Sequence, residues 1–219
     1  MPYLVRTLFL ALLLNLGLTT VMFSQSSSPK YYRLTTQWQG ESKSLDIINN
    51  GENNRLKLAN TKNVSSQYWQ IISLGNGYFR FTNKWLGQEK SIDLLQEGNY
   101  YIPQIAGTGN FSGQNWKLSK VDGSDEFFRL STMWQGDGLA LDIVNDGEKN
   151  NKPRLSNVGN YSGQFWKLTL IATNELATVV DRVPKEPKKN VPIGKKYEKE
   201  ITEGMKKVQE LLDNKKKKN

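Results

Sequence analysis

The triplet Gln67-Tyr68-Trp69 decides the fold, because it returns as Gln114-Asn115-Trp116 and again as Gln164-Phe165-Trp166. The three remaining tryptophans each stand before a short turn that contains glycine. These turns are Trp38-Gln39-Gly40, Trp85-Leu86-Gly87 and Trp134-Gln135-Gly136. All six tryptophans of the 219-residue chain therefore follow one pattern that occurs three times.

Other residue types keep the same register. In each copy an arginine follows an aromatic residue, an aspartate stands between aliphatic residues, and a glycine marks a turn. These markers are Arg33, Arg80 and Arg129, then Asp46, Asp93 and Asp142, then Gly51, Gly98 and Gly147. The arginines and the aspartates are spaced 47 and then 49 residues apart, so the copies have nearly equal length.

Each copy contains four short segments of strand character, separated by clusters of Gly, Asn, Asp and Ser. In the first copy these segments span residues 32–36, 44–48, 55–58 and 68–72. A propeller of four-stranded blades needs about four copies to close, and an open solenoid needs atypical copies at its ends. Three regular copies therefore predict an all-β fold of twelve strands, closed by threefold symmetry over residues 31–172.

The motifs together resemble a known family. Each copy combines a final Gln-x-Trp triplet with an aspartate between two aliphatic residues. These segments are Leu45-Asp46-Ile47, Ile92-Asp93-Leu94 and Leu141-Asp142-Ile143. In this combination the chain resembles a ricin-B-type β-trefoil lectin domain over about 141 of its 219 residues. The resemblance implies a six-stranded barrel capped by three hairpins, and it implies carbohydrate binding.

The marker aspartates are the first candidate carbohydrate-binding residues. Strand alternation sends each of them to the face opposite its aliphatic neighbours, and therefore outward if those neighbours face the core. The resemblance implies that Asp46, Asp93 and Asp142 accept hydrogen bonds from sugar hydroxyls. It also implies that Gln67, Gln114 and Gln164 hold these carboxylates in position, which suits charge-assisted, directional hydrogen bonds. Alternatively, each Asp–Gln pair is purely structural. We expect the tryptophan of each triplet to lie in the core.

The sequence departs from the family where a sugar ring is expected to stack. Ricin-type sites place an aromatic residue at the end of the third strand, but this chain has Ala59, Ala106 and Ser156 there. The candidate replacements are Phe111 and Tyr161, in the segments Asn110-Phe111-Ser112 and Asn160-Tyr161-Ser162, whereas the first copy has Val64. The third copy is therefore the best candidate site, the second comes next, and the first is weakest.

Two alternatives stay open for the aromatic residues. Phe111 and Tyr161 either contact a sugar or pack against the barrel and so hold their loops in place. Trp38, Trp85 and Trp134 are either additional stacking surface or, in the interpretation that we prefer, part of the hairpin cap. The segments that begin at Asn63, Asn110 and Asn160 also match the N-glycosylation pattern, which the repetition alone explains.

Composition limits the chemistry. The chain has no cysteine and no histidine, which removes disulfides, thiol nucleophiles and the commonest general base. A glycosidase needs two carboxyl groups about 5 to 10 Å apart, but the marker aspartates occur once per copy. We therefore predict a protein that is not an enzyme and uses no cofactor and no metal. Most of the net charge of +9 lies in residues 181–219, so we expect no nucleic-acid partner.

The two ends of the chain differ from the repeat. Residues 1–26 contain an apolar stretch after Arg6 and are typical of a signal peptide, with an uncleaved anchor as the alternative. Residues 173–194 are rich in proline and lysine and predict an extended linker. Apolar residues at helical spacing predict an amphipathic helix over 195–213, and residues 214–219 form a Lys-rich flexible end.

These observations predict an exported protein, secreted or in the cell envelope, that binds neutral glycans through up to three shallow sites. The alternative is a protein-interaction scaffold whose trefoil binds no sugar. In that case the helix over residues 195–213 docks a separate protein partner, or it lies on an anionic membrane surface.

Overall fold

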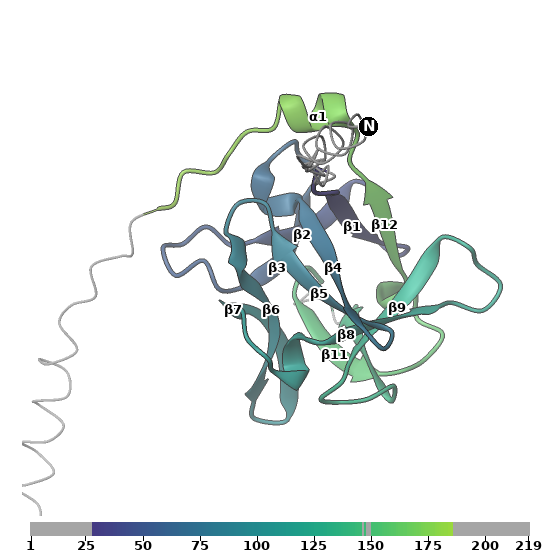
Figure 1. Ribbon diagram of the computed structural model, residues 1–219. Coiled ribbons are helices and arrows are strands. Elements are labelled where there is room, and N and C mark those ends of the chain that lie inside the picture. The colour runs from purple at the N-terminus through teal and green to yellow at the C-terminus, as the bar shows by residue number, and fades with distance from the viewer. Residues whose placement is uncertain (1–27, 146, 148–149, 186–219) are drawn as a thin grey trace, which may run out of the picture.

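The computed structural model describes residues 28–145, 147 and 150–185. The expected signal peptide, the helix over 195–213 and the Lys-rich end lie outside these residues. Within the described ranges, no helix is both long enough and apolar enough to cross a membrane. The described chain forms twelve strands, three short 3-10 helices and one short α-helix (Figure 1).

Each repeat contributes four strands and one 3-10 helix. The first repeat comprises β1 (Tyr32–Thr36), β2 (Lys43–Ile47), β3 (Leu56–Asn60), η1 (Ser65–Gln67) and β4 (Trp69–Gly75). The second comprises β5 (Tyr78–Asn83), β6 (Gly87–Glu97), β7 (Tyr100–Gly107), η2 (Ser112–Gln114) and β8 (Trp116–Lys120). The third comprises β9 (Phe127–Thr132), β10 (Leu139–Ile143), β11 (Pro153–Asn157), η3 (Ser162–Gln164) and β12 (Trp166–Leu170). Helix α1 (Thr173–Ala177) follows the last strand.

The first and last strands of each repeat build a closed barrel. Its strands follow the order β4, β1, β12, β9, β8, β5, and β5 pairs back to β4. Strand β1 pairs with β12 from Tyr32 opposite Leu170 to Thr36 opposite Trp166, so the two ends of the repeat region meet. The barrel has six strands and leaves no unpaired edge, which is the arrangement that three equal copies predict.

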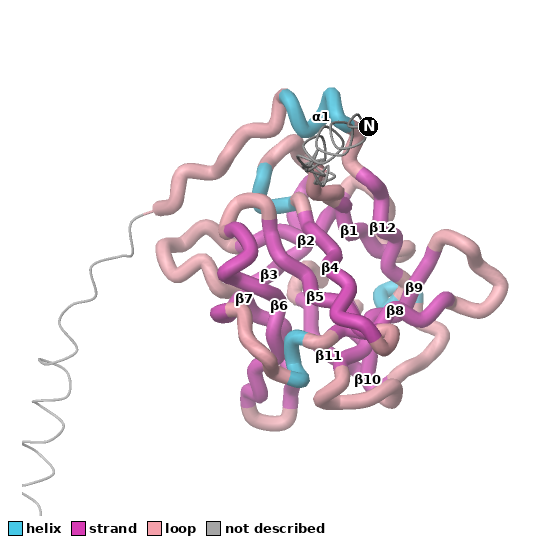
Figure 2. Tube along the Cα trace, viewed as in Figure 1, coloured by secondary structure: helices cyan, strands magenta, loops and turns pink. Residues whose placement is uncertain are grey.

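The middle strands of each repeat form antiparallel hairpins, β2 with β3, β6 with β7, and β10 with β11. Figure 2 shows these hairpins beside the barrel strands. Hydrogen bonds join neighbouring hairpins, from Leu58 N to Asn151 O and from Ile105 N to Asn54 O. The prediction of an all-β β-trefoil with twelve strands is confirmed.

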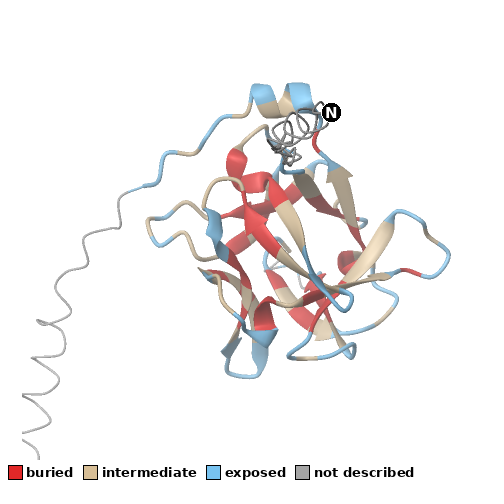
Figure 3. Ribbon diagram, viewed as in Figure 1, coloured by how far each residue is buried: buried red, intermediate tan, exposed pale blue. Residues whose placement is uncertain are grey.

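The core is shared by all three repeats. Trp69, Trp116 and Trp166 are at most 1% exposed, which confirms the prediction that the triplet tryptophans are buried. They pack with the aliphatic neighbours of the marker aspartates and with Leu34, Phe81 and Leu130 of the first barrel strands. Figure 3 shows these buried residues along the barrel and the hairpins. Because one core joins the copies, the aspartate-bearing strands are fixed relative to each other.

The described part of the expected linker differs from the prediction. Residues 173–177 form α1, and residues 178–185 run along the first repeat with hydrogen bonds to Asn63, Ser65 and Asn49. Proline and lysine content indicated an extended linker, and nothing in the sequence indicated these contacts with the first repeat. The contacts that hold this segment come from residues more than 100 positions away, which local sequence patterns do not report.

Candidate functional site

One buried glutamine organises the site region of every repeat. Gln67, Gln114 and Gln164 are 0% exposed. The Nε2 of each glutamine donates a hydrogen bond to the Oδ2 of the marker aspartate in its own repeat, at 3.2 Å, 3.1 Å and 3.2 Å. The expected Gln–Asp hydrogen bond is confirmed in all three copies. The carboxylate in each site is therefore held by a side chain that cannot move freely.

The same glutamine also closes the loop that follows the third strand of the repeat. Its Oε1 accepts a hydrogen bond from a backbone N–H of that loop, in Lys62, Gly109 and Gly159. Its Nε2 donates a second bond to the carbonyl at the end of the strand, in Asn60, Gly107 and Asn157. A buried amide has few other ways to satisfy its donors and acceptor, so the loop and the aspartate are fixed together.

The triplet tryptophan links the site to the core. The Nε1 of each indole donates to the carbonyl of the residue before the aspartate, in Leu45 at 3.0 Å, Ile92 at 3.0 Å and Leu141 at 2.8 Å. The ring that fills the barrel therefore also holds the strand that carries the carboxylate. This double role explains why glutamine and tryptophan occur as one triplet.

The third repeat surrounds its aspartate with an open cavity of about 580 Å³. Asp142 lines this cavity together with Trp38, Arg154, Asn160 and Tyr161. Carboxylate, amide and aromatic groups on one concave surface are the combination that a sugar requires, because its ring has polar edges and an apolar face. The structure thus brings Asp142, Asn160 and Tyr161 together, as the sequence predicted, and adds two residues.

Trp38 reaches this cavity from another repeat. It belongs to the turn between β1 and β2, and its backbone N–H donates to Ser162 O across the closed barrel at 3.2 Å. The same bond joins Trp134 N to Ser112 O at 3.3 Å, so Trp134 lies beside the second repeat. We preferred a hairpin-cap role for these tryptophans. Trp38 does pack against the core, but it also lines the cavity, and Trp134 is 43% exposed.

Phe111 and Tyr161 do not plug their loops into the barrel. They are 58% and 61% exposed, and each ring lies over a glycine of its own loop. A Cβ atom added at Gly109 or Gly159 would lie 2.3 Å or 2.2 Å from the ring, so the ring packs directly on the glycine and would have to move for any other residue. The first repeat has Lys62 in place of this glycine and Val64 in place of the aromatic. These aromatic rings are therefore exposed surface that a ligand can reach.

The second repeat has similar groups in a different arrangement. Asp93 is partly exposed and its Oδ1 accepts the backbone N–H of Leu94 at 2.8 Å. Trp134 forms an edge-to-face pair with Tyr101 at 5.3 Å between ring centroids. Asn110 lines a separate hollow of about 260 Å³, which Asp93 does not line. The expected site residues of the second copy are therefore less closely grouped than those of the third.

The marker carboxylate of the first repeat is covered. Asp46 points away from the core, as strand alternation predicts, but it is 0% exposed because Arg182 covers it. The Arg182 Nη2 atom lies 2.6 Å from Asp46 Oδ2. The prediction of an outward acid that is free to bind hydroxyls is therefore wrong for the first copy. Sequence reasoning missed Arg182, which lies 136 positions from its partner.

The environment of Asp142 gives it a pKa that differs from that of an exposed aspartate. Burial raises the pKa of Asp142 above its ordinary value of 3.8, against the opposing effects of hydrogen bonds from Gln164 and Ser156 and the charge of Arg154. Arg154 stands opposite Asp142 in the β10–β11 hairpin, and its guanidinium lies over the Tyr100 ring at 5.1 Å. Asp142 is 5% exposed, so it is a nearly buried carboxylate that lines an open cavity.

Groups for metal binding are not assembled in the part of the chain that the structure describes. Among residues 28–145, 147 and 150–185, no three acidic side chains are grouped so that they could hold a metal ion. The chemistry that the third-repeat cavity offers is hydrogen bonding to a fixed carboxylate and contact with aromatic rings.

No protein-family model matches the sequence, and a comparison with curated proteins found no match. Solved structures do share the fold. The designed threefold-symmetric protein ThreeFoil matches 64% of this chain and 97% of its own, with a TM-score of 0.52 and 20% identity. A ricin B-like lectin from Macrolepiota procera, solved in complex with lactose, matches 67% of this chain and 99% of its own, with a TM-score of 0.51 and 15% identity.

A third match is to part of an enzyme. The exo-β-1,3-galactanase 1,3Gal43A from Clostridium thermocellum matches 66% of this chain with a TM-score of 0.54 and 17% identity. This chain spans only 31% of that enzyme. The three matches each cover about two thirds of this chain and share its architecture. The chain therefore has the β-trefoil fold, which it shares with a ricin B-like lectin over nearly the whole length of that lectin.

Proposed function

We propose that this protein binds carbohydrate without catalysing a reaction, and that the third repeat carries the principal site. The observation that supports the proposal is the cavity in which Asp142, fixed by Gln164, faces the same space as Trp38 and Tyr161. The carboxylate accepts hydrogen bonds from sugar hydroxyls, and the aromatic rings contact the apolar face of the sugar. The lectin that shares the fold was solved with lactose, which adds support for a glycan ligand.

The proposal also specifies the class of ligand and the cellular location of the protein. We propose neutral glycans as ligands, because Asp142 and the aromatic rings provide an acceptor and a stacking surface. A shallow site for one sugar commonly binds with a Kd of about 1 mM, or about −4 kcal/mol. The second repeat, with Asp93, Phe111 and Trp134, adds a weaker contact that increases avidity on a surface with many glycans. We also propose export, on the basis of the apolar stretch within residues 1–26.

A titration of the full chain with a panel of mono- and disaccharides tests this site. The measurement is the change in amide NMR shifts of the third repeat. We expect Asp142→Asn to weaken binding about 10- to 100-fold, since a hydrogen bond to a charged group contributes about 1.5–3 kcal/mol. Trp38→Ala and Tyr161→Ala are expected to weaken binding at the same resonances. The repeat-equivalent Asp93→Asn is the matched control and should leave these shifts unchanged. Equal affinity in the Asp142→Asn protein would refute the assignment.

The pH dependence of binding gives a second test. Because the pKa of Asp142 is raised, the carboxylate gains a proton at a higher pH than an ordinary aspartate, whose pKa is 3.8. Protonation replaces an acceptor by a neutral acid, so sugar affinity should fall as the pH decreases, with a midpoint above 3.8. Isothermal titration calorimetry between pH 7 and pH 4 measures this change, and residual binding by Asp142→Asn should lack it. A flat profile in the unmodified protein would contradict the role of the carboxylate.

A further inference from the structure

An extended segment of the chain lies in the site region of the first repeat. Residues 178–185 follow α1 (Figure 1). They pair with the loop before η1 through a short parallel bridge between Val64 and Val180. The Val180 N–H donates to Asn63 O and the Ser65 N–H donates to Val180 O, both at 3.1 Å. The first repeat therefore contacts this segment through backbone hydrogen bonds, which is how proteins recognise extended peptides.

Arg182 makes the central side-chain contact. Its Nη2 lies 2.6 Å from Asp46 Oδ2, and its Nη1 donates to Ile47 O at 3.3 Å. The Arg182 backbone N–H donates to Ser65 Oγ at 3.3 Å. Asp46 is fully buried, and its side chain also receives the hydrogen bond from Gln67. The guanidinium thus lies against the fixed carboxylate of Asp46. In the third repeat, the equivalent Asp142 lines an open cavity instead.

The far end of the segment is held by one side chain. The Nδ2 of Asn49 donates to Val183 O, and its Oδ1 accepts from the Lys185 N–H, both at 2.9 Å. An asparagine that contacts a carbonyl and an N–H of the same segment imitates a neighbouring β-strand. The contacts at Asn63, Ser65 and Asn49 involve the backbone of the segment, whereas Asp46 contacts the arginine side chain.

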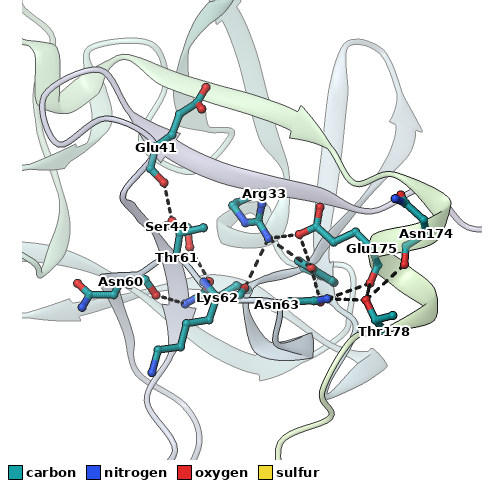
Figure 4. Close-up of polar contacts among 12 residues, drawn as sticks. Arg33, Glu41, Ser44, Asn60, Thr61, Lys62, Asn63, Asn174, Glu175 and Thr178 are labelled. Atoms are coloured by element: carbon teal, nitrogen blue, oxygen red, sulfur yellow. Dashed lines mark hydrogen bonds and ion pairs between the residues drawn. The ribbon is translucent and has the colours of Figure 1, made fainter.

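Helix α1 fixes the start of the segment. The Glu175 carboxylate accepts hydrogen bonds from Arg33 and from the Tyr68 hydroxyl, and Asn63 donates to Glu175 O and to Thr178 Oγ1 (Figure 4). Partial burial opposes ionisation of Glu175, but its bonds to Tyr68 and Arg33 outweigh burial and lower its pKa below 4.5. The carboxylate is therefore charged at neutral pH and anchors α1.

The first repeat differs from the other two in the loop that this segment contacts. Gly113 and Gly163 leave no room for a side chain, since an added Cβ would lie 2.4 Å from Asp93 Oδ1 and from Ile143 O respectively. The equivalent residue in the first repeat is Ser66. Where the other copies have an exposed aromatic, the first repeat has Val64, which pairs with Val180. Val64 therefore offers no aromatic ring to a sugar, and it contacts the peptide segment instead.

We propose that the first repeat is a binding site for an arginine-containing extended peptide, and that residues 178–185 of this chain are its ligand. Asp46 selects the arginine by a charge-assisted bond, and the backbone contacts align the peptide. The site is consequently closed to carbohydrate. This last consequence rests on the function proposed for the third repeat, but the peptide site itself does not.

Hydrogen exchange of the full chain tests the proposal. The amides of Val180, Arg182 and Lys185 are hydrogen-bonded and should exchange slowly. Arg182→Ala and Asp46→Asn are expected to speed their exchange at least about 10-fold, because each removes one partner of the only side-chain ion pair that Arg182 makes among the described residues. Lys185→Ala is the matched control, since the bond at this residue uses the backbone N–H. Unchanged protection in Arg182→Ala would overturn the proposal.

A peptide added in trans tests whether the site recognises arginine. The receptor is the full chain with Val180→Pro and Arg182→Ala, which loses one backbone donor and the guanidinium; near-ultraviolet circular dichroism checks that it is folded. The probe is a synthetic peptide with the sequence of residues 178–185. We expect it to shift the Ser65 amide, and a peptide with alanine at the arginine position to bind at least about 10-fold more weakly. Equal binding of the two peptides, or no binding at millimolar concentration, would refute arginine recognition.

The peptide site and the carbohydrate site can fail independently. Neither the exchange experiment nor the peptide titration contains a sugar. Conversely, Asp46→Asn should leave sugar affinity at the third repeat unchanged while it releases residues 178–185. Sugar-dependent shifts at Ser65 in the unmodified protein would contradict a closed first repeat.

Discussion

Replacement of Trp166 by alanine is expected to lower the free energy of unfolding by about 3–5 kcal/mol, the range for large aromatic residues in a close-packed core. The indole is 0% exposed and lies in the core that all three repeats share. Its removal leaves a cavity that a closed barrel cannot easily collapse around. It also leaves Leu141 O without the 2.8 Å hydrogen bond from the ring.

Chemical denaturation of the full chain, followed by circular dichroism, measures this change. Trp134→Ala is the matched control, because this indole is 43% exposed and belongs to the turn tryptophans. We expect the control to lose about 1 kcal/mol. A loss below about 1 kcal/mol for Trp166→Ala would contradict the description of the triplet tryptophans as the centre of one common core.

Replacement of Gln164 by leucine is expected to destabilise the protein by about 3 kcal/mol and to abolish measurable sugar binding at the third repeat. Leucine has a similar volume but no polar atoms. It leaves Asp142 Oδ2, Asn157 O and Gly159 N without the partner that Gln164 provides. Each buried polar group that loses its partner costs about 1–3 kcal/mol, and water that enters from the cavity reduces the total.

Denaturation and the NMR titration with sugars measure the two parts of this prediction separately. Gln37→Leu is the matched control, since Gln37 is exposed, and it should change stability by less than about 0.5 kcal/mol. Full sugar affinity in Gln164→Leu would mean that the carboxylate of Asp142 does not need the glutamine. Full stability would mean that the buried amide bonds contribute little to the fold.

The threefold repeat made the fold predictable from the sequence. A buried tryptophan, the glutamine two positions before it and an aspartate between aliphatic residues recur in phase. The Gln–Asp and Trp–carbonyl hydrogen bonds are the same in all three copies. The Gln–Asp hydrogen bond could be predicted for the same reason. Local periodicity and threefold equivalence were sufficient because these contacts lie within one repeat.

The binding sites were harder to predict from the sequence, because the three copies differ through contacts that come from outside each repeat. Trp38 reaches the third-repeat cavity only because β1 pairs with β12, and its own sequence neighbourhood indicates a turn and nothing more. Arg182 lies in a segment whose composition is typical of a linker. Val64 indicated that the first copy had diverged, but it did not identify what binds there.

The closure of the barrel has a mechanical consequence. The third-repeat cavity is lined by Trp38, near the start of the folded region, and by Tyr161, near its end. A ligand bound there contacts both residues, so it links the first and last strands of the trefoil where β1 pairs with β12. Unfolding that begins at either of these strands must then break the ligand contacts. A bound ligand should therefore slow mechanical unfolding and slow proteolysis that begins at the first or last strand.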